Sequence, residues 1–159
     1  MTIKPGDKIP TVTLNIMGKS GPEDISSDEI FSGKTVALFG LPGAFTPTCS
    51  AQHVPGFLAN HDALTSKGAD AVVCLAVNDA FVMDAWGKDQ GVGDKIMMVA
   101  DGSANFTKAT GLELDLTERG LGLRCQRFSM VVEDGTVKTL NIDDTGLDKT
   151  SAENMLTQL

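Results

Sequence analysis

Three short runs of apolar residues constrain the fold of this chain more than any other feature of its sequence. They cover residues 35–39, 71–77 and 96–100. A continuous apolar run of this length is typical of a strand covered on both faces, and such strands occur mainly in parallel sheets. Parallel strands need crossover connections, which are usually helices. The runs therefore predict an α/β fold whose mixed central sheet has helices on both faces.

Two further strand regions flank these runs. Residues 11–14 alternate between apolar and polar side chains, as a half-buried strand does. Residues 127–132 are mostly apolar and are soon followed by the pair Asp134-Gly135. Because glycine accepts the positive φ values of tight turns, this pair predicts a β-hairpin in the last third of the chain.

Capping residues and glycines between the strands predict the helices. We expect Asp79 or its neighbour Asn78 to begin one helix that ends at Gly87, and Ser103 to cap the next one. The full set of expected helices covers residues 28–31, 49–63, 80–86, 104–110 and 152–159. This order of elements fits a thioredoxin-like fold in one domain, residues 1–159, with a β extension at the N-terminus.

Composition excludes several classes of function. The chain has 159 residues, of which 42% are hydrophobic, and a formal net charge of −8. An acidic chain lacks the basic face that nucleic acid or an anionic membrane surface requires. No apolar segment is long enough for a signal core or a membrane span, so we expect a soluble, cytoplasmic protein. Three cysteines without CxxC spacing and only two histidines predict neither a disulfide framework nor a metal site.

The segment from Pro42 to Cys49 is the best candidate for chemistry. It follows the first apolar run and contains three breakers, Pro42, Gly43 and Pro47. Pro47 is suited to the first turn of a helix, so Cys49 is expected in that turn. There, unpaired backbone N–H groups and the positive end of the helix dipole favour a thiolate over a neutral thiol. Cys49 is therefore a candidate nucleophile.

A helix end alone does not make a reactive cysteine. A free thiol has a pKa of about 8.5, and a shift to about 6 needs about 3.4 kcal/mol, whereas a helix N-terminus supplies about 0.3–2 kcal/mol. Arg127 is the candidate cation, because it begins a strand that otherwise consists of core residues. An exposed arginine at the strand entry is the alternative. The Thr46 hydroxyl is expected to cap the helix or, alternatively, to bind substrate.

The motif Pro42-x-x-x-Thr46-x-x-Cys49 resembles the signature of the peroxiredoxins, and residues 39–50 as a whole resemble the type II subfamily. Four more segments in the expected order also resemble that subfamily, and together the matches extend over the whole chain. They are residues 53–57, 66–69, 77–82 and 127–132.

The resemblance implies a thiol peroxidase that needs no metal or organic cofactor. Cys49 would attack hydrogen peroxide or an organic hydroperoxide and become a sulfenic acid. Arg127 would stabilise the thiolate and hold the peroxide, Thr46 would hydrogen-bond the peroxide, and Pro42 would shield the sulfur from water. Gly43 and Phe45 would line the substrate pocket. A redox-sensing or chaperone-like module that Cys49 oxidation switches is the alternative function.

The sequence offers several candidates for the thiol that reduces the Cys49 sulfenic acid. The C-terminal region in which some type II members carry a second cysteine has none here. Cys74 matches another such position, but its apolar run equally suits a buried core thiol. Cys125 would share a face with Arg127 if the strand extends that far, although a passive, partly exposed thiol is favoured. We therefore expect glutaredoxin with glutathione, or thioredoxin, as the reductant. The resemblance also implies a homodimer, and His53 is expected to make structural hydrogen bonds.

Overall fold

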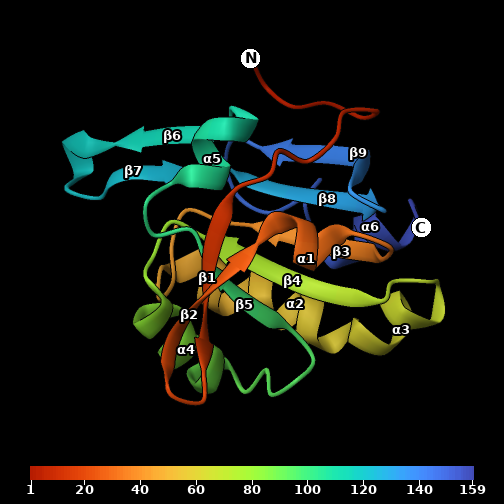
Figure 1. Ribbon diagram of the computed structural model, residues 1–159, viewed down its shortest axis with the longest axis horizontal. Helices are drawn as coiled ribbons and strands as arrows, with labels where there is room; N and C mark the ends of the chain where they lie inside the picture. The colour runs from red at the N-terminus through yellow and green to blue at the C-terminus, as the bar shows by residue number, and fades with distance from the viewer.

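A seven-stranded mixed sheet forms the centre of the protein in a computed structural model that describes residues 1–159. Its strands are β1 (Thr13–Gly18), β2 (Gly21–Ser26), β3 (Thr35–Gly40), β4 (Ala71–Ala76), β5 (Met97–Ala100), β8 (Arg127–Glu133) and β9 (Thr136–Asp143). The strand order is β2-β1-β5-β4-β3-β8-β9 (Figure 1). Strands β3, β4 and β5 are parallel neighbours, and the other pairs are antiparallel. The three apolar runs thus form the parallel centre of the sheet.

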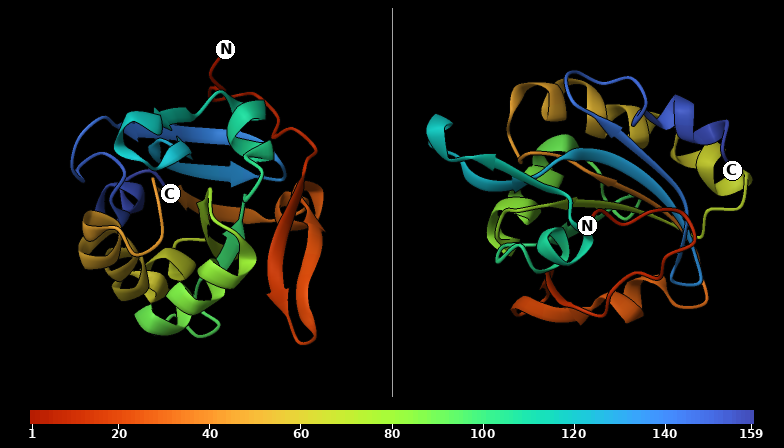
Figure 2. Two further views of the ribbon diagram at one scale, coloured as in Figure 1. Left: turned by 90° about the vertical axis from the view of Figure 1, so that its left-hand side faces the viewer. Right: turned by 90° about the horizontal axis from the view of Figure 1, so that it is seen from above.

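Helices cover both faces of this sheet, as Figure 2 shows. The helical segments are α1 (Ser27–Phe31), the π-helix η1 (Cys49–His53), α2 (Val54–Ala59), α3 (His61–Ser66), α4 (Ala80–Gln90), α5 (Asn105–Thr110), the 3₁₀ turn η2 (Thr117–Arg119) and α6 (Ala152–Leu156). Buried side chains of η1, α2, α3, α4 and α6 belong to one core cluster, and those of α1 and α5 belong to a second. No helix is long and apolar enough to cross a membrane.

Successive residues of the central strands point into different clusters. In β3, Ala37 and Phe39 pack into the first cluster, while Val36 and Leu38 pack into the second. This period of two is the geometry of a strand buried on both faces, and it explains why the strand is apolar throughout. The predicted α/β, thioredoxin-like fold with a mixed sheet is therefore confirmed.

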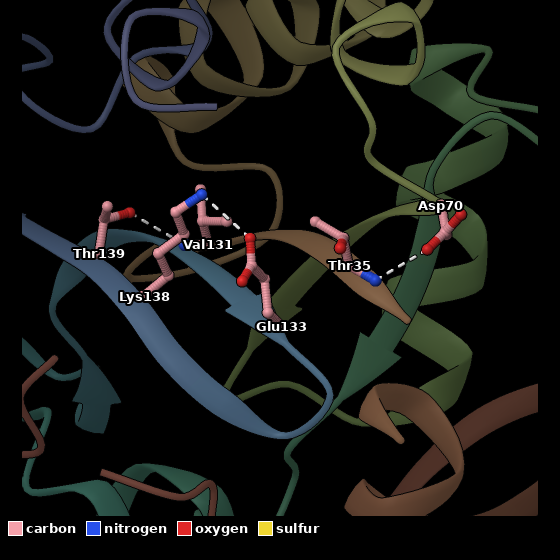
Figure 3. A network of polar contacts seen from close by, with 6 residues as sticks. All are labelled: Thr35, Asp70, Val131, Glu133, Lys138 and Thr139. Atoms are coloured by element: carbon pink, nitrogen blue, oxygen red, sulfur yellow. Dashed lines mark hydrogen bonds and ion pairs between the residues drawn. The ribbon is translucent and has the colours of Figure 1, made fainter. Parts of the chain in front are cut away.

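Hydrogen bonds fix the start of β3 and the β8–β9 hairpin (Figure 3). The Thr35 backbone N–H donates to Asp70, 2.8 Å away. The register of β8 and β9 shifts between Val131 and Val132, and the Val131 N–H donates to the Thr139 hydroxyl at 3.2 Å. The predicted turn lies between these strands, where Gly135 has a φ of 77°.

Three predicted helix boundaries are wrong. The last helix, α6, ends at Leu156 and not at Leu159. Helix α4 continues past Gly87 to Gln90 and ends at Gly91 instead. Gly87 lies inside the helix, and a glycine is needed there because Met98 packs closely against it. Helix α5 is not capped by Ser103. Instead, the carboxylate of Asp101 accepts two backbone N–H groups in the first turn of α5, from Phe106 at 3.1 Å and from Thr107 at 2.9 Å. A cap can therefore lie several residues away from the position that sequence suggests.

A second sheet of two antiparallel strands, β6 (Glu113–Leu116) and β7 (Gly122–Cys125), is absent from our sequence prediction. The 3₁₀ turn η2 connects the strands, and the hairpin projects from the body of the molecule at the left of Figure 1. Four-residue strands with half-exposed apolar residues give a weak periodic signal. This hairpin leads directly into β8 and forms part of the wall of the cavity described below.

Candidate active site

Cys49 lies where the chain turns from β3 into the first helical segment. The helical conformation starts at Pro47, and the Val54 N–H donates to the Cys49 carbonyl in an i to i+5 pattern. This pattern makes η1 a π-helix. Such helices are rare in proteins, and those that occur are often at functional sites. The expected continuous helix over residues 49–63 is therefore divided into η1, α2 and α3. Cys49 has no exposed surface, so its sulfur is shielded from bulk water.

Arg127 contacts the sulfur of Cys49 directly. Its Nη2 donates to Cys49 Sγ, 3.2 Å away. Strand β8 runs antiparallel to β3, and Phe128 pairs with Gly40, so Arg127 lies beside the loop that leads to Cys49. Only 9% of Arg127 is exposed, which excludes the alternative of an exposed arginine. A guanidinium at this distance favours the thiolate over the thiol.

Thr46 does not cap the helix, contrary to our expectation. Its hydroxyl donates to the Gly43 carbonyl, 2.7 Å away. Since this bond uses the only hydroxyl hydrogen, the Thr46 oxygen is left with lone pairs that can accept a hydrogen bond. An acceptor next to Cys49 is suited to a substrate that carries an O–H group.

A cavity of about 430 Å³ lies beside Thr46 and Arg127, and the buried Cys49 is not itself among the residues that line it. Pro42, Thr46 and Arg127 line it, together with Pro47 and Thr48 from the start of the helix. The β6–β7 hairpin also lines it, through Leu114, Leu116, Arg119 and Leu121. Sequence reasoning missed all four of these residues. The alternation of apolar and acidic residues over 113–116 is the only local signal for them.

Gly43 and Phe45, which we expected in the substrate pocket, are not among the residues that line this cavity. A Cβ atom at Gly43 would lie 2.6 Å from Nη1 of Arg124. Arg124 donates to the carbonyls of Leu121, at 2.8 Å, and Pro42, at 3.3 Å. Gly43 therefore leaves room for an arginine that joins the hairpin to the active-site loop. Phe45 is 53% exposed, with a φ of 63°.

His53 lies behind Arg127 and is buried. Nη1 of Arg127 lies 2.8 Å from Nδ1 of His53, and Nε2 of His53 lies 3.0 Å from the Thr150 carbonyl. Arginine only donates, so Nδ1 accepts, and the ring hydrogen is on Nε2, which donates to Thr150. Burial, and then the charge of Arg127, lower the pKa of His53 to about 3. The expected structural hydrogen bonds are confirmed, and the imidazole is neutral at physiological pH.

We predict that His53 makes the protein sensitive to mild acid. Its pKa is near 6.5 when unfolded and about 3 when folded, so the unfolded state binds one more proton between these values. The free energy of unfolding should therefore fall as the pH drops through this window, by up to about 1.4 kcal/mol per unit. Arg127 disfavours the protonated ring, whereas Asp143 favours it. Denaturant titrations at pH 7, 6 and 5 measure this slope. His53→Asn should reduce it.

The other two cysteines are buried thiols. Cys74 lies in the same core cluster as Cys49, in the middle of β4 between Phe39 and Met98 of the neighbouring strands. Burial is the main cause that raises its pKa well above the usual value, and the neighbouring sulfur atoms of Cys49 and Cys125 add to this effect. Cys125 belongs to the second cluster, so it shares no face with Arg127, and it is not partly exposed as we expected. Its Sγ donates to the Leu41 carbonyl at 3.1 Å.

Comparisons with known proteins find relatives that match nearly the whole chain. The family model described as Redoxin matches residues 4–156. Peroxiredoxin-2E, chloroplastic, of Arabidopsis thaliana is 45% identical over 163 residues, which is 99% of this chain and 70% of that protein. Peroxiredoxin-2D of the same plant is 44% identical over 156 residues, 97% of this chain and 96% of that protein.

One solved structure with a closely similar fold is that of reduced Prx3 from Vibrio vulnificus in complex with H₂O₂. It is 44% identical, has a TM-score of 0.94, and the match covers 99% of each chain. These relatives are 44–45% identical to this chain, and each match covers nearly all of it. They show that the chain belongs to the type II peroxiredoxins and is a thiol-dependent peroxidase.

Proposed function

We propose that Cys49 is the nucleophile of this peroxidase and that Arg127 activates it. The observation that carries the proposal is the contact of 3.2 Å between Arg127 Nη2 and Cys49 Sγ, in a site with almost no exposure to water. A charge interaction is much stronger in such surroundings than at the surface. The contact therefore places a positive charge where it stabilises negative charge on the Cys49 sulfur.

The parts of the site suggest how the reaction proceeds. Sγ of Cys49 attacks the terminal oxygen of the hydroperoxide, so that an S–O bond forms as the O–O bond breaks. Negative charge moves to the leaving oxygen, where guanidinium N–H groups of Arg127 stabilise it. The Thr46 oxygen accepts from the peroxide hydroxyl. The leaving group takes a proton from solvent to give an alcohol or water, and Cys49 becomes a sulfenic acid.

The cavity supports both hydrogen peroxide and organic hydroperoxides as substrates. Three leucines of the β6–β7 hairpin line it together with Thr46 and Arg127. The volume of about 430 Å³ is far larger than hydrogen peroxide needs. Apolar contact with the hairpin would stabilise the alkyl group of an organic hydroperoxide while its peroxide group reaches Thr46 and Arg127. Steady-state rates with both classes of peroxide test this range.

We further propose that an external thiol, from glutaredoxin with glutathione or from thioredoxin, reduces the sulfenic acid. One thiol forms a mixed disulfide with Cys49 and releases water, and a second thiol reduces that disulfide. The position of Cys74 supports this route. Strands on both sides hold it in the centre of the sheet, and burial disfavours its thiolate. A disulfide between the two cysteines would require their Cα atoms to lie within about 7 Å of each other and both thiols to be freed from the core.

We predict that one equivalent of peroxide converts Cys49 to a sulfenic acid that persists until an external thiol is added. Intact-mass analysis with a sulfenic-acid trap should show the adduct on Cys49 in most molecules, and Cys74→Ala should give the same result. A Cys49–Cys74 disulfide in most wild-type molecules would contradict the external-thiol route, without affecting the assignment of Cys49 as nucleophile.

A homodimer and a cytoplasmic location complete the proposal. Phe45 and Phe81 are 53% and 66% exposed. The Ala44 N–H donates to Asn78, 2.9 Å away, so the active-site loop and the start of α4 lie together. Exposed aromatic residues on one side favour a protein interface. The three unpaired cysteines fit a reducing compartment.

We predict that Phe81→Asp gives a monomer. A charged side chain at the centre of an apolar interface is unfavourable, because it loses its hydration when the interface forms. Light scattering after size exclusion should show a dimer for the wild type and a monomer for this variant. Met97→Gln, at an exposed apolar residue on another part of the surface, should leave the mass unchanged. A wild-type monomer at every concentration would contradict the dimer.

A further inference from the structure

A continuous path of hydrogen bonds runs from Arg127 through His53 and Thr150 to the carboxylate of Asp143, which also lines the cavity. We propose that His53, held by the loop between Asp143 and Thr150, positions the Arg127 guanidinium against Cys49. This inference rests on the proposed function of Arg127. It adds three positioning residues, none of which belongs to the motif around Cys49.

Arg127 needs such support because its side chain is long and flexible. An arginine loses considerable rotamer entropy when it is held in one conformation, so a fixed partner is required for precise geometry. A carboxylate is the usual partner, yet none of the ion pairs in the protein includes Arg127. Its Nη1 instead donates to Nδ1 of His53 at 2.8 Å, while Nη2 contacts Cys49.

A neutral partner has a chemical advantage at this position. A carboxylate paired with Arg127 would compensate its charge and weaken its attraction for the Cys49 thiolate. The imidazole of His53 accepts a hydrogen bond without bringing a negative charge. The hydrogen-bond partner of Nη1 therefore adds no negative charge beside the sulfur.

His53 can accept from Arg127 only if its ring is held in one tautomer and orientation. The Thr150 carbonyl provides this restraint, because it accepts the Nε2 hydrogen at 3.0 Å. Both His53 and Thr150 are buried, at 1% and 0% exposure. A carbonyl acceptor at Nε2 leaves the lone pair on Nδ1, which faces Arg127.

Asp143 in turn holds Thr150 in place. Its carboxylate accepts the backbone N–H groups of Asp148, Lys149 and Thr150, at 2.9, 3.1 and 3.0 Å, and the Thr150 hydroxyl at 2.7 Å. Burial raises the pKa of the Asp143 carboxyl, but these hydrogen bonds outweigh burial, and the net pKa is lowered. Asp143 pairs with Arg127 in the register of β8 and β9, yet its oxygens bind the loop instead of the guanidinium.

Two substitutions of His53 separate its two hydrogen bonds. His53→Asn places an amide oxygen near the position of Nδ1, so it can still accept from Arg127 but loses Thr150. His53→Gln places an amide nitrogen near the position of Nε2, so it can still donate to Thr150 but loses Arg127. Both variants remove the imidazole and create space in the core, so a purely structural role predicts similar losses in activity and in thermal stability.

We expect the rate constant of Cys49 oxidation by hydrogen peroxide to fall by at least about tenfold in His53→Gln, since a hydrogen bond to a charged group contributes this much. His53→Asn should stay closer to the wild type. The ultraviolet absorbance of the Cys49 thiolate, measured against pH without any turnover, should show its midpoint at higher pH in His53→Gln than in His53→Asn. Equal rate constants and equal midpoints in the two variants would overturn the proposal.

The loop provides a second, independent arm. Asp143→Asn removes one strong acceptor from the loop and should lower the rate constant, with the thiolate midpoint moving in the same direction as in His53→Gln. Asp148→Asn is the matched control, because it changes the same charge on an exposed side chain of the same loop. Failure of the wild type itself to react with peroxide through Cys49 would refute the proposed function. If the wild type reacts and Asp143→Asn has the same rate constant and thiolate midpoint as the wild type, only the positioning role of the loop is refuted.

Discussion

Cys49→Ser is expected to abolish peroxidase activity. A serine hydroxyl stays protonated near neutral pH and is a poor nucleophile toward peroxide, whereas the cysteine thiolate is a strong one. Removal of a catalytic nucleophile costs about 10⁴–10⁶-fold in well-studied enzymes, so the variant should show only the background reaction of the thiol donor. Peroxide consumption with a thiol donor measures this loss, and the thermal unfolding midpoint shows whether the variant is folded.

The other two cysteines provide matched controls. Cys125→Ser keeps a donor for the Leu41 carbonyl, which lies 3.1 Å from the sulfur, and should retain most of the activity. Cys74→Ala removes a buried thiol from the middle of β4. It should lower stability through the small cavity that it leaves without preventing the first oxidation of Cys49. Turnover that remains in Cys49→Ser but is lost in Cys125→Ser would show that Cys125, and not Cys49, is the nucleophile.

The nucleophile and its activating cation could be inferred from sequence because both depend on strong local signals. Pro47 starts a helix at a fixed distance from Cys49, and the apolar strand before it is well defined. Arg127 is conspicuous as a charged residue at the start of an apolar strand. The π-helical geometry of η1 has no comparable signal, since the same residues also fit an α-helix.

The surroundings of the site depend on contacts between distant segments and could not be inferred in this way. The β6–β7 hairpin reaches the cavity through the fold, and its short strands carry little periodicity. Arg124 lies against Gly43 over a separation of 81 residues, which no local pattern indicates. The side to which Cys125 points could not be predicted for a related reason. The chain changes from one sheet to another between β7 and β8, so the alternation of strand residues does not continue across Gln126.

The role of Asp143 shows the same limit. In the sequence it belongs to an acidic pair that suits an exposed turn, whereas in the structure it is 8% exposed and organises the loop up to Thr150. Its hydrogen bonds go mostly to backbone groups, which carry no sequence signature. Chemistry that side chains perform is therefore easier to predict from this sequence than the positioning of those side chains by main-chain groups.

Arg127→Lys is expected to lower the rate constant of Cys49 oxidation by about 10²–10³-fold, the usual cost of removing one donor that stabilises developing charge. Lysine keeps the positive charge, but a single ammonium lacks the planar fork that contacts His53 and Cys49 through two different nitrogens. Arg127→Gln removes the charge as well and should have a larger effect. Trp86 can report the reaction, because its indole N–H donates to Ser50, the residue after Cys49, at 3.1 Å.

Stopped-flow fluorescence with excess hydrogen peroxide would give the rate constant for each variant, and the midpoint of the thiolate absorbance would separate two effects of Arg127. A loss of rate that higher pH restores indicates that the variant lacks thiolate. A loss that persists at high pH indicates that the transition state itself is less stable. Lys138→Gln, which removes one positive charge from the exposed end of the β8–β9 hairpin, is the control. Because the guanidinium contacts the sulfur directly, we expect both effects in Arg127→Gln and mainly the second in Arg127→Lys; a lysine variant with the wild-type rate constant would show that charge alone is sufficient.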